Sequence, residues 1–387
     1  MSIVISLLFI IAPFLTIPLI ILGLIRDRKH SIVYIVLLAL LMALIAYNFN
    51  PKHTQDLYRY NYIMSREYAP LDLGQYLQIM FNNNKFLFAF LRYIISQVGN
   101  LRILPFICVL IGYFIVIYTI FDYTKVKNIK TYKGIFILIV FLCIFYFINF
   151  ISGLAQFLAT SIGFLAFYLE YVKDKRKIYY KILYVLPGFI HASMFLILLI
   201  RILLIFDFKK TKYFIIPLFI FYGVAKNMMY NIVILFENVP LINNLVSKAN
   251  MYLLESQSTW YSTYGITIIL LLLFFMAVYL LTNKKYRHIE NEKFCDLIFI
   301  VLLFNICSVQ YFDIYTRIFD FSIVLMNLYL LQILDIVKRK YKIIIIIGLV
   351  LFSLLLGSVN LNLIQANDFN NIFSNMNQNI FYFLRNS

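Results

Sequence analysis

Charged residues are scarce in this chain of 387 residues: Asp, Glu, Lys and Arg make up 13% of it, against about 25% in soluble domains. It has no glycine-rich phosphate loop, no G-x-S-x-G and no H-E-x-x-H, so the usual signatures of nucleotide-binding proteins, α/β-hydrolases and zinc proteases are missing. Its four cysteines lie in apolar runs without C-x-x-C spacing, which indicates neither a zinc site nor a disulfide framework. We therefore expect no metal and no cofactor.

Apolar runs, by contrast, recur from end to end. The chain is 63% hydrophobic with a mean hydropathy of +0.87, and a membrane-spanning helix needs about 20 apolar residues. The predicted spans are Ser2–Ile25, Ser31–Tyr47, Leu101–Phe121, Gly134–Phe150, Gln156–Val172, Ile182–Phe206, Tyr213–Phe236, Gly265–Thr282, Phe294–Tyr311, Ile318–Val337 and Ile343–Ile364. We expect an all-α polytopic transmembrane helical bundle of about 11–13 membrane segments, one or two of them re-entrant or broken. Residues 1–387 would form a single integral membrane domain.

Most of the 34 Lys and Arg residues are gathered in short segments between the apolar runs. These basic loops are Arg26–Lys29, Lys125–Lys133, Lys173–Lys181, Lys209–Lys212, Lys284–Lys293 and Lys338–Lys342. Such clusters are typical of cytoplasmic loops. A net charge of +17 would suggest nucleic acid as the partner of a soluble protein, but here it reports orientation and contact with anionic lipid head groups.

These loops predict the topology. The N-terminus lacks a basic n-region, so we expect an uncleaved first helix with its N-terminus outside and an outer loop over residues 48–85. The shorter apolar segment Phe86–Val98 must then enter and leave on the outer side, as a re-entrant or interfacial helix. Residues 182–236 allow two interpretations: a break near Pro187-Gly188 into two half-length helices, which we favour, or an exception to the charge rule at Lys209–Lys212. A second outer loop, 237–263, and an interfacial tail, 365–387, complete the prediction.

The first outer loop carries the most prominent charged cluster of the chain. If Asp56–Glu67 is helical, Asp56, Arg59 and Tyr60 share a face at i, i+3 and i+4, and Arg66 follows about two turns on. A carboxylate can act as a base, and guanidinium groups bind phosphate oxygens bidentately. The alternative is a solvated surface helix with an ion pair worth about 0.3–0.5 kcal/mol.

His191 lies near the middle of Ile182–Phe206, deep in the membrane. An ionisable residue at that depth is costly and suggests a functional site, since imidazole can accept a proton near neutral pH. The alternative is a neutral histidine in a helix–helix hydrogen bond, with Ser193 nearby.

Three further places carry polar groups at the outer ends of spans. Arg317 has Asp313 at i−4 and Asp320 at i+3, so it is either neutralised by them or oriented by one toward a phosphate. Gln156 belongs to a small, polar stripe that is typical of close helix packing, and it is the member we expect to reach substrate. Arg92 and Arg102 could snorkel to lipid head groups.

Three short motifs together resemble the EpsG family of bacterial polysaccharide polymerases, the Wzy-like enzymes of capsule and exopolysaccharide synthesis. The motifs are Asp56-Leu-Tyr-Arg59-Tyr60, then Ser152-Gly-Leu-Ala-Gln156-Phe-Leu-Ala, and finally Phe189-Ile-His191-Ala-Ser193-Met followed by Arg317. One position departs from the family pattern, which usually has Arg directly before the glutamine, where this chain has Ala155.

The resemblance implies glycosyl transfer at the outer face of the bacterial cytoplasmic membrane, without a metal or a nucleotide sugar. Substrates would be undecaprenyl-diphosphate-linked saccharides; membrane lipids would surround the enzyme, and a flippase and a chain-length regulator would be candidate partner proteins. Asp56 or His191 would take the proton of the acceptor hydroxyl, and Arg59, Tyr60, Arg66, Gln156 and Arg317 would bind substrate and diphosphate. The Asp56–Arg59 turn, His191 and Arg317 would converge in a cavity open to the exterior.

Two other functions fit the same charges. A transporter or flippase of lipid-linked oligosaccharide would bind without chemistry, although no inverted repeat is evident. A membrane O-acyltransferase modifying the glycan could use His191, but would leave the Asp-Arg loop unexplained.

Overall fold

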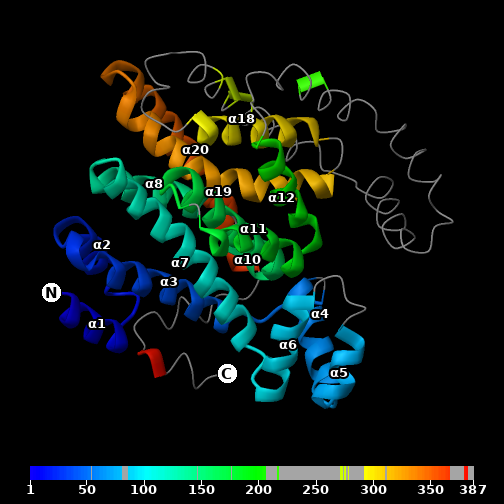
Figure 1. Ribbon diagram of the computed structural model, residues 1–387. Helices are drawn as coiled ribbons and strands as arrows, with labels where there is room; N and C mark the ends of the chain where they lie inside the picture. The colour runs from blue at the N-terminus through cyan, green and yellow to red at the C-terminus, as the bar shows by residue number, and fades with distance from the viewer. Residues whose placement is uncertain are drawn as a thin grey trace. The chain divides into compact units, whose positions relative to one another are not determined.

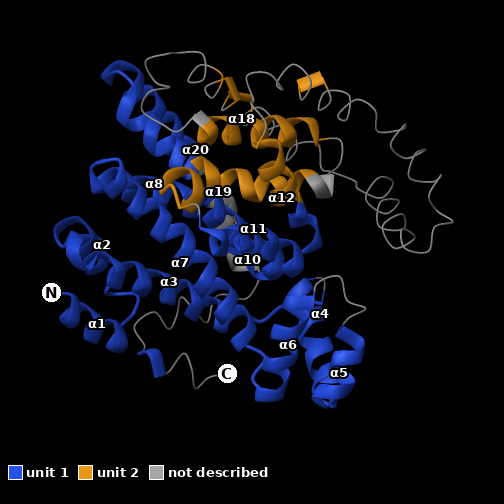
Figure 2. Ribbon diagram, in the orientation of Figure 1, with its two compact units in different colours: residues 1–168, 176–195, 327–387 blue, residues 169–175, 196–326 orange. Residues whose placement is uncertain are grey.

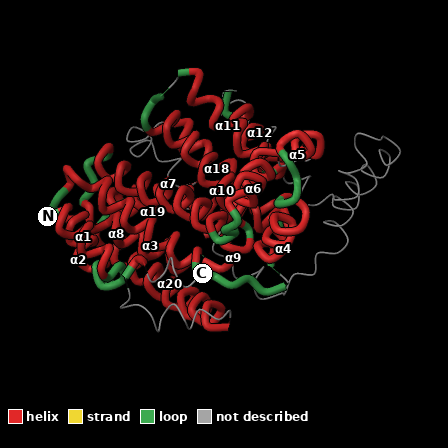
Figure 3. The backbone as a smooth tube through the Cα atoms, turned by 90° about the horizontal axis from the view of Figure 1, so that it is seen from below, coloured by secondary structure: helices red, strands yellow, loops and turns green. Residues whose placement is uncertain are grey.

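The computed structural model describes residues 1–53, 55–80, 86–145, 147–175, 177–205, 216–217, 271–272, 274–275, 278, 292–309, 312–366 and 379–381. Within these residues the chain forms helices joined by turns, without a strand (Figure 3). The all-α helical bundle is therefore confirmed. The predicted spans Tyr213–Phe236 and Gly265–Thr282, the outer loop 237–263 and the tail 365–387 lie wholly or almost wholly outside the described residues.

Four described helices are long and apolar enough to cross a membrane, namely Arg28–Tyr47, Ile103–Val126, Leu154–Val172 and Tyr315–Ile336. Each overlaps a span predicted from the sequence. Their length follows from uninterrupted apolar runs, because a helix rises 1.5 Å per residue and the hydrocarbon core is about 30 Å thick. The chain is a membrane protein.

The chain divides into two compact units, shown in different colours in Figure 2. Unit 1 contains residues 1–168, 176–195 and 327–387, and unit 2 contains residues 169–175 and 196–326.

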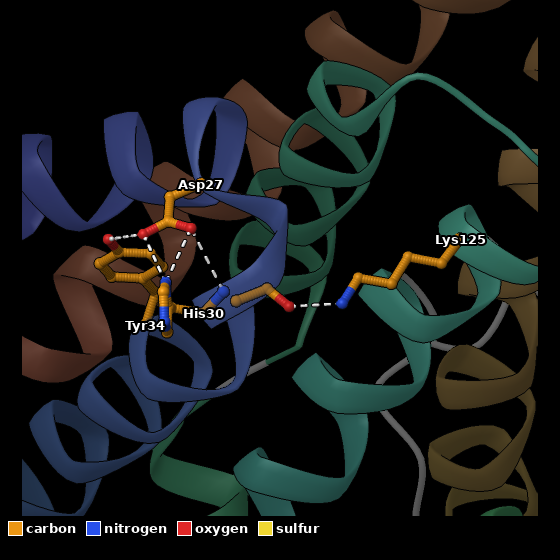
Figure 4. A network of polar contacts seen from close by, with 5 residues as sticks. Asp27, His30, Tyr34 and Lys125 are labelled. Atoms are coloured by element: carbon orange, nitrogen blue, oxygen red, sulfur yellow. Dashed lines mark hydrogen bonds and ion pairs between the residues drawn. The ribbon is translucent and has the colours of Figure 1, made fainter. Parts of the chain in front are cut away.

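Unit 1 is built around the antiparallel pair α3 (Ser31–Tyr47) and α7 (Ile103–Val126). At one end of the pair, Asn100 Nδ2 donates to the Tyr47 hydroxyl over 2.8 Å. At the other end, Lys125 Nζ donates to Ser31 Oγ over 2.6 Å (Figure 4). The two helices are therefore paired along their whole length, and residues 48–102 leave and return at the Tyr47 end.

The Lys125 end of unit 1 gathers three of the predicted cytoplasmic loops. Lys133 Nζ lies 2.7 Å from Asp335 Oδ1, just before the Lys338–Lys342 cluster. Helix α20 (Arg339–Ala366) starts within that cluster and packs against α8 (Thr131–Ile144), which starts within Lys125–Lys133. We call this the basic end and the opposite one the Tyr47 end. Basic loops that meet at one end are what the positive-inside rule requires.

A polar turn joins α2 to α3 at the basic end. Figure 4 shows Asp27 facing the Tyr34 hydroxyl, which donates over 3.2 Å, and the His30 ring, whose Nδ1 lies 3.0 Å from either carboxylate oxygen. Desolvation raises the pKa of Asp27, but the hydrogen bonds from His30 and Tyr34 outweigh it and hold that pKa below its ordinary value. The carboxylate thus keeps its charge and caps the single turn Arg28–His30.

The first predicted span, Ser2–Ile25, is not one continuous helix. It consists of α1 (Ser2–Ile11) and α2 (Ile17–Arg26), joined by turns in which Thr16 N–H donates to the Ala12 carbonyl. Pro13 and Pro18 lack the N–H that a helix needs, and their rings clash with the preceding turn. The prediction of a single helix was wrong at these prolines.

The predicted span Gly134–Phe150 is also interrupted. Helix α8 ends at Ile144, Phe145 is extended (φ −89°, ψ 112°), and α9 (Phe147–Ser152) follows before α10 (Leu154–Phe167). The Tyr113 ring lies 5.2 Å from that of Phe150 and 5.6 Å from that of Phe157. This aromatic cluster packs the interruption against α7, so its bend is part of the core.

In unit 2, α18 (Glu292–Cys307) matches the predicted span Phe294–Tyr311, and most of α19 (Phe312–Ile336) follows it. Asn305, fully buried, donates from Nδ2 to the Tyr315 carbonyl over 3.5 Å. Elsewhere in the unit, Arg201 forms a two-pronged ion pair with Glu170, Nε to Oε2 at 2.7 Å and Nη2 to Oε1 at 2.6 Å. Arg201 is thus held by a carboxylate.

Candidate functional site

The predicted outer loop folds into a small helical subdomain at the Tyr47 end. It comprises α4 (Asp56–Ile63), the π-helical turn η2 (Met64–Tyr68), α5 (Leu73–Met80) and α6 (Phe86–Val98), with α6 packed on both η2 and α5 (Figure 1). We call it the α4–α6 subdomain. Because α3 and α7 are antiparallel, residues 48–102, which include α6, leave and return on the same side of the bundle. This is the connectivity predicted for a re-entrant or interfacial segment.

Asp56 and Arg59 form the predicted pair on α4. Arg59 Nη2 lies 2.9 Å from Asp56 Oδ1, with 63% of the arginine and 48% of the aspartate side chain exposed. A pair as open as this adds little stability, since exposed i, i+3 pairs contribute about 0.3–0.5 kcal/mol. Its exposure leaves the remaining guanidinium and carboxylate hydrogen-bonding positions available to a ligand.

Tyr60 points into the subdomain. Its side chain is buried, and its ring packs edge-on against Phe88 at 5.3 Å. Burial and the charge of Asp56 raise the pKa of Tyr60 to about 12, although Arg92 and Arg59 oppose the rise. Tyr60 therefore keeps its proton at neutral pH, and its hydroxyl can donate a hydrogen bond but cannot serve as a general base.

Arg66 and Glu67 lie in the π-turn η2, where Ala69 N–H donates to the Met64 carbonyl. Both side chains are exposed, and neither makes an ion pair with the residues that the structure describes. The π-turn changes the helical register on which the sequence placed them two turns beyond Asp56. Turns of this kind occur often at functional sites.

Arg92 is the residue that the sequence analysis misplaced. It was expected to snorkel toward lipid head groups, but it is only 5% exposed. The reason is its position on the buried face of α6, together with Phe88, Ala89, Tyr93 and Ser96. That i, i+4 spacing could have revealed its burial.

His191 lies at a break in the predicted span Ile182–Phe206. Helix α11 (Ile178–Ile190) ends there, His191 is extended (φ −146°, ψ 115°), and the short turn η4 (Ala192–Met194) precedes α12 (Phe195–Leu203). The favoured break near Pro187-Gly188 is confirmed, three residues beyond Gly188. Helix α11 continues through Pro187, and its last backbone hydrogen bond runs from His191 N–H to the Pro187 carbonyl, so the break lies one turn beyond the proline.

The imidazole of His191 is nearly buried, 8% exposed, and its Nδ1 lies 2.7 Å from Ser193 Oγ. Helix α11 has 13 residues, so it carries His191 about 20 Å from its start. The Phe189 ring lies 4.7 Å from that of Phe86, at the start of α6. The break thus lies against the α4–α6 subdomain.

Gln156 is partly exposed in the first turn of α10. Its neighbour Ala155, where the family pattern usually has arginine, is 1% exposed. Helix α10 contacts α9 and η4, and Thr160 Oγ1 lies 3.7 Å from Met194 Sδ. Helix α9 also contacts α4. Each of these elements therefore contacts the next in a closed succession, in the order α4, α9, α10, η4, α11, α6, η2 and back to α4. Six predicted site residues lie on or between these elements: Asp56, Arg59, Tyr60, Arg66, Gln156 and His191.

Arg317 belongs to unit 2, near the start of the span Tyr315–Ile336, and is partly exposed. Asp56 and His191 belong to unit 1, so the convergence of all three remains a prediction. As for metals, the described ranges contain no group of three His, Cys, Asp or Glu that could hold an ion.

These features define a polytopic α-helical membrane protein with a broken helix at a buried histidine and an exposed Asp-Arg pair at one end of the bundle. The sequence matches the EpsG family over residues 52–375. The chain belongs to that family, which is a Wzy-like polymerase family, and its function is therefore of the polysaccharide-polymerase type, carried out by a glycosyltransferase-like membrane enzyme. No curated protein and no solved structure matches the chain.

Proposed function

We propose that this protein joins undecaprenyl-diphosphate-linked oligosaccharide repeat units into a capsular or extracellular polysaccharide at the outer face of the cytoplasmic membrane. The observation that carries the proposal is the family match over residues 52–375, which includes all seven candidate site residues. The closed succession of elements that carries six of them supports it. The donor brings its own leaving group, so the reaction requires no nucleotide.

In the proposed reaction, the hydroxyl oxygen at the non-reducing end of one lipid-linked repeat attacks the anomeric carbon of the growing glycan. The bond between that carbon and the diphosphate oxygen breaks, and undecaprenyl diphosphate leaves with the bonding electrons. Asp56 or His191 accepts the hydroxyl proton. Arg59, Arg66 and Arg317 stabilise the negative charge that develops on the diphosphate.

Each assigned residue in unit 1 has the chemistry that its role needs. The Asp56 carboxylate is about half exposed and can reach a ligand. His191 presents an imidazole whose Nδ1 lies 2.7 Å from Ser193 Oγ, and an imidazole can exchange a proton near neutral pH. Tyr60 is protonated at neutral pH, and its hydroxyl oxygen accepts a hydrogen bond from Arg59 in the Asp56–Arg59 turn. Gln156 would bind a sugar hydroxyl through its amide.

The distribution of charge supports the proposed sidedness of this site. The basic end carries Lys125, Lys133 and the Lys338–Lys342 cluster, and the α4–α6 subdomain lies at the opposite end of α3 and α7. The positive-inside rule then assigns the subdomain to the exterior. A lipid-linked substrate would enter from the outer leaflet.

Labelling of single cysteines in intact cells tests this orientation. We expect an impermeant maleimide to label Glu67→Cys, at an exposed position in η2, and to leave Lys130→Cys, exposed at the basic end, unlabelled until the cells are opened. The native chain, with its four cysteines in apolar runs, supplies the background. Labelling of Lys130→Cys in intact cells, with Glu67→Cys protected, would reverse the proposed orientation.

Deletion of the gene followed by glycan sizing tests the function itself. We expect single repeat units to reach the outer surface while long chains disappear. Accumulation of repeats facing the cytoplasm would instead support a transporter or flippase. Chains of normal length that lack only acyl groups would support an O-acyltransferase.

The break at His191 offers a test of its catalytic placement. A Cβ built on Gly188 would lie 2.4 Å from the Phe195 ring, so Gly188→Val must push the ring and the His191 turn apart. We expect shortened or lost polymer from this variant, on glycan gels normalised to membrane protein level. Gly348→Val, on α20 with open space around the added carbons, is the matched control and should retain long chains. Equal ladders from both variants would contradict a role for the turn.

A further inference from the structure

The buried guanidinium of Arg92 is the feature of the α4–α6 subdomain that the reaction above does not use. Arg92 Nη2 donates to the Tyr68 hydroxyl over 3.2 Å, and Nε has no hydrogen-bond partner. Among the described residues no carboxylate pairs with it. A buried charge without a counter-ion is costly, and arginine cannot shed its proton to avoid that cost.

Aromatic rings take the place of the missing carboxylate. The Arg92 guanidinium carbon lies 5.1 Å from the centroid of the Tyr60 ring, 5.2 Å from that of Tyr68 and 5.5 Å from that of Phe88. A cation over the face of an aromatic ring is attracted by its quadrupole, most strongly where water is excluded. These rings come from α4, η2 and α6, so a single cation holds three elements together.

Tyr60 connects the cluster of Arg92 and its three aromatic rings to the Asp56–Arg59 turn. Its ring is enclosed by Arg92 and Phe88, while its hydroxyl is subject to the charges of Asp56 and Arg59, and Arg59 also hydrogen-bonds it. Arg59 in turn bonds Asp56 at 2.9 Å. A continuous series of contacts thus leads from the buried Arg92 through Tyr60 to the exposed Asp56–Arg59 pair, which lies on the same turn of α4 as Tyr60.

We propose that Arg92 is a positioning residue: acting through Tyr60, it holds the Asp56–Arg59 turn in the orientation that polymerisation uses. This inference rests on the function proposed above. An exposed i, i+3 ion pair is weak by itself. The orientation of the pair must therefore be fixed by the buried residues to which it is connected, Tyr60 and Arg92. Misplacement of a reacting group by about 1 Å can cost about 10²-fold in rate.

A double-mutant cycle on purified enzyme in liposomes, supplied with an undecaprenyl-diphosphate-linked repeat unit, tests the coupling. We expect Arg92→Met to lower kcat about 10²-fold with little change in KM. In an Arg59→Met background, the same substitution should lower kcat less than about threefold further, because residues that act through one another are not additive. Arg92→Lys keeps the cation over the rings and should recover most of the lost kcat.

Two milder variants keep the test valid if Arg92→Met fails to fold. Tyr68→Phe removes only the hydroxyl that accepts from Arg92, and we expect it to lower kcat. Tyr93→Phe is its matched control, because that hydroxyl bonds the Leu71 carbonyl rather than Arg92. Arg102→Met, at the N-cap of α7, controls for loss of a positive charge at the same end.

The outcomes separate the two proposals. If Arg59→Met is impaired and Arg92→Met lowers kcat by the same factor in both backgrounds, the positioning role is overturned while the proposed function stands. If Tyr68→Phe and Tyr93→Phe behave alike, the role is likewise overturned. If Arg59→Met itself polymerises normally, the proposed use of the Asp56–Arg59 turn fails, and the inference fails with it.

Discussion

Asparagine in place of Asp56 is expected to abolish long-chain polymer while the protein stays in the membrane. The substitution keeps the size and a hydrogen-bonding oxygen of the side chain but removes its charge and basicity. Loss of a general base typically costs about 10²–10⁴-fold in rate. Asp56 is the first residue of α4 and its partner Arg59 is exposed, so the loss of stability should be only about 0.3–1 kcal/mol.

The measurement is a glycan ladder from cells in which the variant replaces the native gene, with protein level checked by immunoblot of membranes. Glu67→Gln is the matched control, because Glu67 is an exposed carboxylate in the same subdomain without a described partner. It should give normal ladders. A normal ladder from Asp56→Asn as well would reduce the Asp56–Arg59 pair to a surface contact and leave His191 as the candidate base.

Alanine in place of Arg317 is the second change with a large expected effect. If this guanidinium stabilises the departing diphosphate, its removal should lower the rate about 10²–10³-fold, as for other preorganised groups that meet developing charge. Arg317 is partly exposed near the start of a membrane span, so protein level should change little.

Arg339→Ala provides the comparison, since Arg339 is exposed where α20 begins within a basic cluster. It should leave chain length unchanged. The length of the glycan ladder is measured for both variants. Chains of normal length from Arg317→Ala would contradict a role in stabilising the diphosphate and would leave Arg317 only its contacts with helical neighbours, such as Asp320.

Sequence-based predictions are correct where one local property determines the structure. Helices α3 and α6 have the bounds predicted for Ser31–Tyr47 and Phe86–Val98, because each is a short apolar run between polar turns. The Asp56–Arg59 contact followed from i, i+3 spacing alone. The break at His191 followed from a proline inside an apolar run, combined with basic loops on either side.

Sequence-based predictions are wrong where the structure depends on several residues together or on distant parts of the chain. The predicted first span ignored the two prolines that divide it into α1 and α2. The burial of Arg92 depends on Tyr60 and Tyr68, which lie on segments more than twenty residues upstream. Spacing within one helix can show that Arg92 faces inward, but it cannot show that aromatic rings surround its guanidinium group.

The candidate site was predicted in part. The structure brings the elements next to or carrying six predicted site residues into one succession of contacts: Asp56, Arg59, Tyr60, Arg66, Gln156 and His191. It adds Arg92, which no motif indicated. The junction of this group with Arg317 depends on the arrangement of helices that are separate in sequence, and it remains a prediction.

The most direct test of the central claim is polymerisation by the purified protein alone. Liposomes containing the native chain and an undecaprenyl-diphosphate-linked repeat unit should produce a ladder of glycan lengths and release one undecaprenyl diphosphate per bond formed, whereas liposomes with Asp56→Asn should not. Movement of the lipid-linked unit across the bilayer without any gain in glycan length would contradict the account.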